Sequence, residues 1–145
     1  MSIISNAPIQ PYLIFEGRCQ EALDFYQKAL GAKIGMVMRF KDSPEPPSGD
    51  CGGGNPNAIM HSSFQIGEST IMASDGRCQS AAKFEGFSLS YTVKSEAEAA
   101  EKYNALLEGG QVIMPLTKTF FSPSFGMLTD KFGVSWMIYM AGAQH

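Results

Sequence analysis

Hydrophobic and polar positions follow an order of elements that occurs twice along the chain. In the first half, an extended segment at 9–15 is broken by Gly17, and the apolar residues of 18–30 then recur at helical spacing. Gly31 stands where a helix ends in a left-handed cap. The first half therefore predicts a strand and a helix, which three further strands follow, at about 33–40, 58–66 and 70–74.

The second half predicts the same order. Residues 87–93 alternate between apolar and hydroxyl-bearing side chains, as in a strand with one buried face. Ser95 and Glu98 have the spacing of a capping box, and Gly109 ends the helix that this box begins. Three more strands are expected after the helix, at about 111–115, 125–129 and 135–140.

Each half thus has the order of a βαβββ module, and the two modules indicate an internal duplication. We predict an α+β fold in which module one covers about 8–75 and module two about 86–141. Neither module can bury its sheet alone, so a single domain of residues 1–145 is expected. The segment 41–57, with four prolines and four glycines, is either a plain connection or a lid over a pocket.

Composition narrows the class of protein. The 145 residues carry a net charge of −3 and a pI of about 5.3, which argues against binding to nucleic acid or anionic membranes. The sequence has no apolar run long enough for a membrane span, and the first ten residues lack the features of a signal peptide. Its three cysteines have no metal-type spacing, so we expect a cytoplasmic protein without disulfides. Only 17% of the residues are charged, which favours self-association.

Several short motifs resemble one known group of proteins. They are Pro11-Tyr12-Leu13-x-Phe15-x-Gly17, Ala22-x2-Phe25-Tyr26, Leu30-Gly31-Ala32, Ile59-Met60-His61, Ser74-Asp75, Thr119-Phe120-Phe121 and the segment from Phe125 to Ile138. Together with the duplicated order, these motifs resemble the vicinal-oxygen-chelate superfamily, which includes glyoxalase I, extradiol dioxygenases and bleomycin-resistance proteins. Within it they are similar to the PhnB-like subgroup, over nearly the whole chain.

The resemblance implies that each module curves a mixed sheet, with its helix on the convex face. Paired modules then form a cup-shaped site, either within one chain or between two, and many members of the superfamily are dimers. In the members that use a metal ion, His, Glu or Gln side chains from the first and last strand of each module hold it. We therefore expect a homodimer with a cup.

The metal positions of the superfamily fall on Pro11, Ile71, Ser88 and Met137. Proline and isoleucine have no side-chain donor, and a thioether is a poor ligand for hard divalent cations. We therefore expect no metal and no other cofactor, which disfavours glyoxalase and dioxygenase chemistry. The methyltransferase label common in the subgroup is disfavoured as well, because the sequence lacks alternating strands and helices with a glycine-rich turn after the first strand.

Alternation from these positions predicts the wall of the cup. The expected ligand-binding residues are Pro11, Leu13, Phe15, His61, Ile71, Ser88, Ser90, Phe121, Met137 and Tyr139. This wall is apolar with hydroxyl groups, and it suits a small organic molecule. Arg18, Arg39 and Lys118 either present a positive group to that molecule or are solvated surface charges.

Few residues offer chemistry of their own. His61 is expected to line the pocket, with the role of a general base as the alternative. Cys19 lies near a helix N-terminus but has no histidine close in the sequence, so we expect an ordinary cysteine. Cys51 and Cys78 are interpreted in the same way. The glycines at 52–54 have no helix after them and are not expected to bind phosphate.

Three hypotheses for function follow. The first is a metal-independent protein that binds or sequesters a small organic molecule, and it leaves open whether any reaction is catalysed. The second is an enzyme that acts on a small metabolite by side-chain acid–base chemistry, with His61 or a tyrosine in that role. The third is a metal-dependent enzyme of the glyoxalase or dioxygenase type, if the ligand positions are misplaced.

Overall fold

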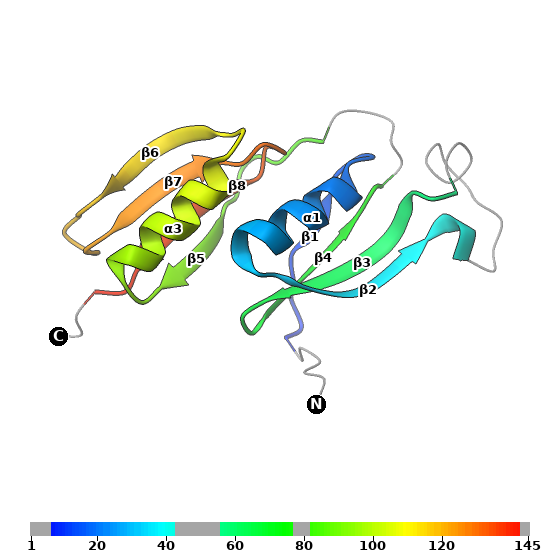
Figure 1. Ribbon diagram of the computed structural model, residues 1–145, viewed down its shortest axis with the longest axis horizontal. Coiled ribbons are helices and arrows are strands. Elements are labelled where there is room, and N and C mark those ends of the chain that lie inside the picture. The colour runs from blue at the N-terminus through cyan, green and yellow to red at the C-terminus, as the bar shows by residue number, and fades with distance from the viewer. Residues whose placement is uncertain (1–6, 43–55, 77–81, 143–145) are drawn as a thin grey trace. The chain divides into compact units, whose positions relative to one another are not determined.

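The order strand, helix, strand, strand, strand occurs twice in the computed structural model (Figure 1). The structure describes residues 7–42, 56–76 and 82–142, and its contacts divide the chain into two units, Met1–Ala82 and Lys83–His145. Each unit has a four-stranded mixed sheet and a helix of 12 residues. The predicted α+β fold of two βαβββ modules is confirmed. Most of the segment 41–57, with Cys51, and also Cys78 lie outside the described residues.

The first unit contains β1 (Tyr12–Ile14), α1 (Cys19–Leu30), β2 (Lys33–Arg39), β3 (Ile59–Ile66) and β4 (Ser69–Ser74), with a short 3-10 turn at Phe40–Asp42. The strand order is β1-β4-β3-β2. The pair β1 and β4 is parallel, and the other pairs are antiparallel. The sheet is therefore mixed, as expected for this module.

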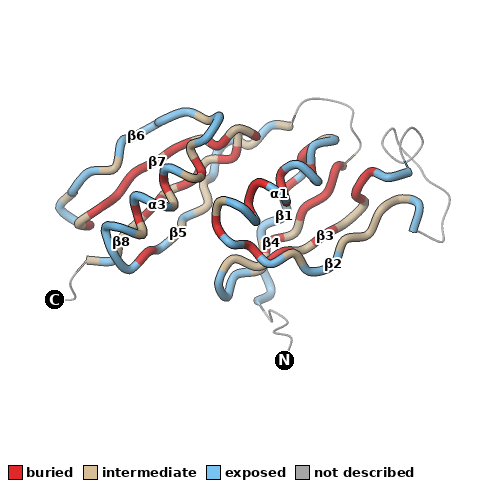
Figure 2. Tube along the Cα trace, viewed as in Figure 1, coloured by how far each residue is buried: buried red, intermediate tan, exposed pale blue. Residues whose placement is uncertain are grey.

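The second unit contains β5 (Leu89–Val93), α3 (Glu96–Leu107), β6 (Gln111–Thr117), β7 (Phe125–Thr129) and β8 (Ser135–Met140). Its order, β5-β8-β7-β6, repeats that of the first unit, again with one parallel pair, β5 and β8. The edge strands β2 and β6 contain no buried residue, whereas their inner neighbours β3 and β7 do (Figure 2).

Helix α1 covers one face of the first sheet through its apolar side. Tyr26 is fully buried, and its ring contacts Phe15 of the segment after β1 and Phe64 of β3, with centroid distances of 6.2 and 5.7 Å. The helix ends at Gly31, which has the left-handed φ of 67° that a side chain rarely adopts. The amphipathic pattern and the glycine cap are therefore both realised as predicted.

The carboxylate of Asp75 fixes the start of α1 to the sheet. One oxygen accepts a hydrogen bond from the backbone N–H of Cys19, the first residue of α1, and the other accepts from Ile59, the first residue of β3. Both distances are 2.7 Å, and Asp75 is buried. Because a buried backbone N–H without an acceptor is costly, this side chain stabilises the two elements in one arrangement.

Helix α3 lies close to its sheet because β7 has a glycine beneath it. The hydroxyl of Tyr103 donates to the carbonyl oxygens of Met114 and Met127, at 2.9 and 3.2 Å. A Cβ at Gly126 would approach the Tyr103 ring to 2.7 Å, so only glycine allows this contact. At the N-terminus, Ser95 accepts from the Glu98 N–H, and Glu98 accepts from Lys94 rather than from Ser95 itself. The predicted capping box therefore forms, but its second hydrogen bond comes from the N–H of Lys94, one residue before Ser95.

A second buried carboxylate, Asp130, sets the turn between β7 and β8. It accepts from the backbone N–H groups of Phe132 and Val134 and from the indole of Trp136, at 2.9 to 3.0 Å. The segment that the sequence analysis joined through residues 130–133 is thus a turn organised around one side chain.

The first strand of each unit is shorter than predicted. Strand β1 has three residues rather than seven, and β5 begins at Leu89 rather than at 87. Both are edge strands that pair with one neighbour only, and Pro11 has no N–H for a further bond, although its carbonyl accepts from Met72. None of the helices within the described residues is long and apolar enough to cross a membrane.

We expect Asp75→Ala to lower the free energy of unfolding by about 2–4 kcal/mol, because two buried N–H donors lose their acceptor. Urea denaturation followed by circular dichroism measures this change. The control is Asp24→Ala on the exposed side of α1, which we expect to stay within about 0.5 kcal/mol of the wild type. Equal unfolding free energies for the two variants would contradict the role assigned to Asp75.

Candidate functional site

Each sheet has one face that its helix leaves uncovered, and we call this the helix-free face. In the first unit it carries Tyr12, His61, Ser63 and Met72, which alternate with residues buried beneath α1. Met72 pairs with Tyr12 in β1 and with Ser63 in β3, so these three form one row across the sheet. All four side chains are partly or largely exposed, which leaves them available to a ligand.

Tyr12 and His61 are joined on this face. The phenol oxygen lies 3.2 Å from Nδ1 of the imidazole, and the ring centroids are 5.6 Å apart. Strand β4 separates their two strands, so the Tyr12 side chain crosses β4 to reach His61. His61 is thus placed on the helix-free face with a hydrogen-bonding partner, as a pocket-lining histidine would be. The sequence analysis named Tyr12 only as part of a family motif, and its partner is 49 residues away.

The second unit presents a mainly aromatic helix-free face. Ser90 pairs with Met137, and Phe125 pairs with Tyr139, on the opposite side from Trp136 and Ile138, which are buried. The ring of Phe121 contacts Phe125 edge-on at 5.0 Å and stacks on Tyr139 at 6.4 Å. The structure therefore brings together Ser90, Met137, Tyr139 and Phe121, four of the expected ligand-binding residues.

Four expected residues do not share this placement. Leu13, Phe15 and Ile71 are at most 5% exposed and pack on the α1 side of the first sheet. Pro11 has the same phase as Leu13 along the chain. The predicted alternation was therefore wrong by one residue in β1 and β4, because α1 needs Leu13 and Phe15 for the core and leaves Tyr12 and Met72 on the other face.

Ser88, the remaining expected residue, precedes β5. Its hydroxyl lies 2.7 Å from that of Ser135, at the first residue of β8. The pair of hydroxyls bridges the ends of two neighbouring strands. Ser88 therefore has a structural partner at the edge of the predicted site.

The register also corrects the expected metal positions. Tyr12 and Met72 are paired across β1 and β4 as Ser90 and Met137 are paired across β5 and β8. These four positions are thus equivalent in the two units, and they replace Pro11, Ile71 and Ser88. A phenol, a hydroxyl and two thioethers do not fit a divalent cation that prefers imidazole and carboxylate. Within the described ranges, no group of three or more His, Cys, Asp or Glu residues is placed to hold a metal ion.

The cationic candidates are engaged elsewhere or exposed. Arg18 forms an ion pair with Glu21 at 2.9 Å on the surface of α1. Arg39 donates to the carbonyl oxygen of Asn57 and to the side chain of Gln20. Lys118 is exposed after β6. Two of the three side chains that were candidates for contact with an anionic group therefore have partners of their own.

Cys19 is an ordinary buried cysteine. Burial, with a smaller effect of the Asp75 charge, raises the pKa of its thiol from 9.0 to about 12, while the contact with the Ser62 hydroxyl, at 3.8 Å, and the Arg39 charge act in the other direction. Its position at the start of α1 is used by the backbone, which binds Asp75. Two tyrosines are also not activated, because burial raises the pKa of Tyr91 and Tyr103.

Comparison with known proteins finds relatives that span nearly the whole chain. Residues 7–139 match the family model described as 3-demethylubiquinone-9 3-methyltransferase. Protein YjdN of Escherichia coli K12 is 34% identical over 143 residues, covering 94% of this chain and 97% of YjdN. The structure of PA1353 from Pseudomonas aeruginosa is 42% identical, with a TM-score of 0.82 and coverage of 94% and 98% of the two chains. The PhnB protein from Bacillus cereus is 29% identical, with a TM-score of 0.77 and coverage of 93% and 100%.

A more distant likeness concerns the fold alone. The fosfomycin resistance protein FosX from Listeria monocytogenes is 12% identical, with a TM-score of 0.63, and 97% of this chain and 96% of FosX are covered. FosX is a member of the vicinal-oxygen-chelate superfamily. The duplicated topology described above is therefore shared well beyond the nearer relatives.

The buried thiol predicts slow alkylation of Cys19. With a pKa of about 12 instead of 9.0, its thiolate fraction near neutral pH is about a thousandfold smaller than that of an unperturbed cysteine. In a C51S/C78S background, we expect iodoacetamide to label Cys19 at least about a hundredfold faster in urea than in the native protein. Mass spectrometry over time measures the two rates, and equal rates would show that the thiol is accessible.

Proposed function

Since the chain belongs to the PhnB-like family of the vicinal-oxygen-chelate superfamily, we propose that it binds a small organic molecule on its helix-free sheet faces, without a divalent metal ion. The observation that carries this proposal is the chemistry of those faces. Each combines thioether or aromatic side chains with hydroxyl groups, and apart from Phe125, which is buried, these side chains are partly or largely exposed. When an apolar molecule covers such a surface, less apolar area is exposed to water, and this favours binding.

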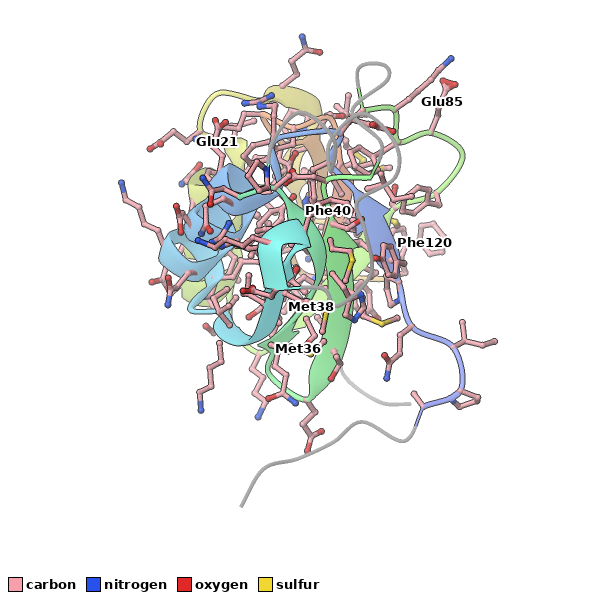
Figure 3. All side chains as sticks on the ribbon, turned by 90° about the vertical axis from the view of Figure 1, so that its right-hand side faces the viewer. Glu21, Met36, Met38, Phe40, Glu85 and Phe120 are labelled. Carbon is pink, nitrogen blue, oxygen red and sulfur yellow. The ribbon has the colours of Figure 1, made fainter. Side chains whose placement is uncertain are left out.

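The aromatic group of the second unit supports this proposal most directly. Phe120 is fully exposed and Phe121 is 43% exposed, although their rings are in contact with each other at 5.1 Å. In Figure 3 the Phe120 side chain lies at the margin of the drawn side chains. Covering a phenylalanine side chain is worth about 1.5–3 kcal/mol. Because Phe121 is 43% exposed and Tyr139 is already partly buried, a planar ligand that covers both rings would gain about 1–2 kcal/mol from them in total.

The first unit supports the proposal with softer side chains. Met38 pairs with His61, and Met72 pairs with Tyr12, so two thioethers flank the tyrosine–histidine pair. Met36 is 47% exposed and is a near neighbour of Met38 along β2 (Figure 3). Methionine adapts its shape to irregular apolar ligands, which fits a binding surface better than a rigid catalytic pocket.

Metal independence is part of this proposal because of the donor set. The equivalent positions Tyr12, Met72, Ser90 and Met137 carry no imidazole and no carboxylate. Glyoxalase and dioxygenase reactions need the ion as a Lewis acid or oxygen carrier. We therefore leave these two reactions out of the proposal.

The methyl transfer in the family's description is left out for a different reason. Cofactor sites for nucleotide-like groups are built at the ends of adjacent parallel strands with a glycine-rich turn. Here each sheet has a single parallel pair, at its edge, and β1 is followed by Glu16-Gly17-Arg18 rather than by a glycine-rich turn. The residues therefore offer no site of that kind within the described part of the chain.

A homodimer in the cytoplasm completes the proposal. The sequence is poor in charged residues, at 17%, and several large apolar side chains of the described chain are exposed. Ile113 of β6, for example, is 56% exposed. A second copy that covers such residues would reduce the apolar surface in contact with water.

An enzyme with side-chain acid–base chemistry is the second candidate function. The hydrogen bond between Tyr12 and His61 favours it, because a phenol that fixes one imidazole nitrogen leaves the other available for proton transfer. In this alternative His61 acts on the substrate, and Tyr12 orients the imidazole.

Binding of the fluorescent probe 8-anilinonaphthalene-1-sulfonate tests the first function. We expect micromolar affinity that EDTA leaves unchanged. Met72→Gln and Met137→Gln each weaken binding at least about tenfold, because a neutral polar side chain replaces an apolar contact. The control is Ala100→Gln on the exposed side of α3, which leaves the affinity unchanged. Native mass spectrometry of untagged protein reports the dimer and any retained ligand.

Two results would contradict this function. One is the absence of any bound molecule in native mass spectrometry and in a broad metabolite screen. The other is a rise in melting temperature when nickel, zinc, iron or manganese is added to EDTA-treated protein, since a bound ion stabilises the folded state. The second result would bring back the metal-dependent alternative.

For the enzymatic alternative, we expect His61→Gln to abolish turnover of any substrate found for the protein, while its melting temperature stays the same. Glutamine keeps a hydrogen-bonding group on the helix-free face but cannot exchange a proton near neutral pH. A steady-state assay on the wild type and the variant measures this effect. Turnover that is unchanged in the variant would remove His61 from the mechanism.

A further inference from the structure

We infer that Tyr12 and His61 form a recognition pair for an oxyanion, so that the ligand of the first unit is an apolar or aromatic molecule with a carboxylate or similar acidic group. This inference rests on the proposed function, because it assumes that the helix-free face of the first sheet binds a small molecule. It is carried by the contact between the two side chains and by the groups that surround them.

The contact places two polar groups at the same point of the helix-free face. The phenol oxygen and Nδ1 are 3.2 Å apart, and the rings are tilted by 34°. Tyr12 is 43% exposed, and His61 is partly exposed, so a ligand can reach both. None of the four strands of this sheet contains an aspartate or a glutamate.

The protonation state of His61 decides what the pair presents to a ligand. In a neutral imidazole, one nitrogen donates and the other accepts, so the pair keeps one donor and one acceptor for other groups. In the imidazolium, Nδ1–H donates to the phenol oxygen, which leaves both the phenol O–H and Nε2–H as donors. Nε2 lies on the opposite edge of the ring from Nδ1, so the imidazolium offers Nε2–H and its positive charge to an oxyanion, while Tyr12 orients the ring through Nδ1.

Neighbouring side chains complete this site. Ser63 lies two residues after His61 on the same face, and its oxygen accepts from the N–H of Met36 at 3.4 Å, so its own hydrogen is left to donate. Met38 and Met72 are the cross-strand partners of His61 and Tyr12. The site therefore combines donors for the acidic group with thioethers for the apolar body of the ligand.

Other charged groups around His61 have places of their own. Asp75 follows β4 and accepts from Cys19 and Ile59, and Arg39 ends β2 and donates to Asn57 and Gln20. Glu16 follows β1, beyond Ile14, and lies next to Gly76. Lys33 of β2 also lies on the helix-free face, but it pairs with Gln65, four residues along β3 from His61. Among the described residues of this sheet, His61 is therefore the ionisable base beside Tyr12, and its charge is expected to control anion binding there.

Benzoate and benzamide are the probes that test this inference, because they have nearly the same shape but differ in charge. The sequence has two histidines, so proton NMR of an H145Q variant follows the His61 ring alone. We expect benzoate to shift the His61 signals, with a Kd that is lower at about pH 5.5 than at about pH 8.5, because the charge of an imidazolium attracts the carboxylate. Benzamide is expected to bind at least about tenfold more weakly at the lowest pH.

Three variants separate recognition from folding. We expect His61→Gln to remove the pH dependence of benzoate binding and Tyr12→Phe to weaken binding several-fold at low pH while a smaller pH dependence remains. The control is Tyr91→Phe in β5, which removes a phenol from the second unit and leaves benzoate binding unchanged. Circular dichroism confirms that each variant is folded.

The outcomes distinguish this inference from the proposed function. If 8-anilinonaphthalene-1-sulfonate binds but benzoate does not, or benzoate binds with a Kd independent of pH and of both substitutions, the inference is overturned and the proposed function stands. Equal affinity for benzamide and benzoate overturns it as well. If neither the naphthalene probe nor any metabolite binds, the proposed function itself has failed.

Discussion

The buried carboxylate of Asp75 is the constraint on which the first unit depends. Its two hydrogen bonds join the first residue of α1 to the first residue of β3, and so they decide which face of the sheet the helix covers. The residues beneath the helix then form the core, and those that alternate with them are left on the helix-free face. Asp130 has a comparable role in the second unit, where it sets the turn before β8 through Trp136 and two backbone N–H groups. Both carboxylates stabilise a backbone arrangement, and neither faces a ligand.

Local patterns were sufficient to predict most of the fold. The helix that Gly31 ends, the helix that Ser95 begins, and the strands 125–129 and 135–140 were all placed from signals within a few residues. The phase of β1 could not be predicted in this way. Strand β1 has three residues, which is too few for alternation to define a face. Because the superfamily position was carried over to Pro11, every residue expected to face the ligand in β1 was shifted by one position. What decides the phase is the demand of α1 for Leu13 and Phe15, which is a tertiary contact.

The candidate site likewise has residues whose placement follows from local patterns and residues whose placement depends on tertiary contacts. Ser90, Met137 and Tyr139 lie on one face, because β5 and β8 are long enough to alternate clearly and pair in register. The link between Tyr12 and His61 was not foreseen, because it crosses a strand and joins residues far apart in the chain. No spacing rule relates such residues, since they become neighbours only when β4 inserts between β1 and β3. Edge-on contacts such as that of Phe121 with Phe125 are hidden from the sequence for a similar reason.

The two units have the same frame but different chemistry. By register, Tyr12 and Met72 correspond to Ser90 and Met137, and Ser63 corresponds to Met127. His61, two residues before Ser63, therefore corresponds to Phe125, two residues before Met127. The position that holds an imidazole in one unit thus holds a phenyl ring in the other, and a tyrosine has been exchanged for a serine. The duplicated topology supplies two similar surfaces, and among the described residues the imidazole lies on only the first of them. Specificity in this fold is therefore a property of a few side chains, which explains why the fold alone does not identify the ligand.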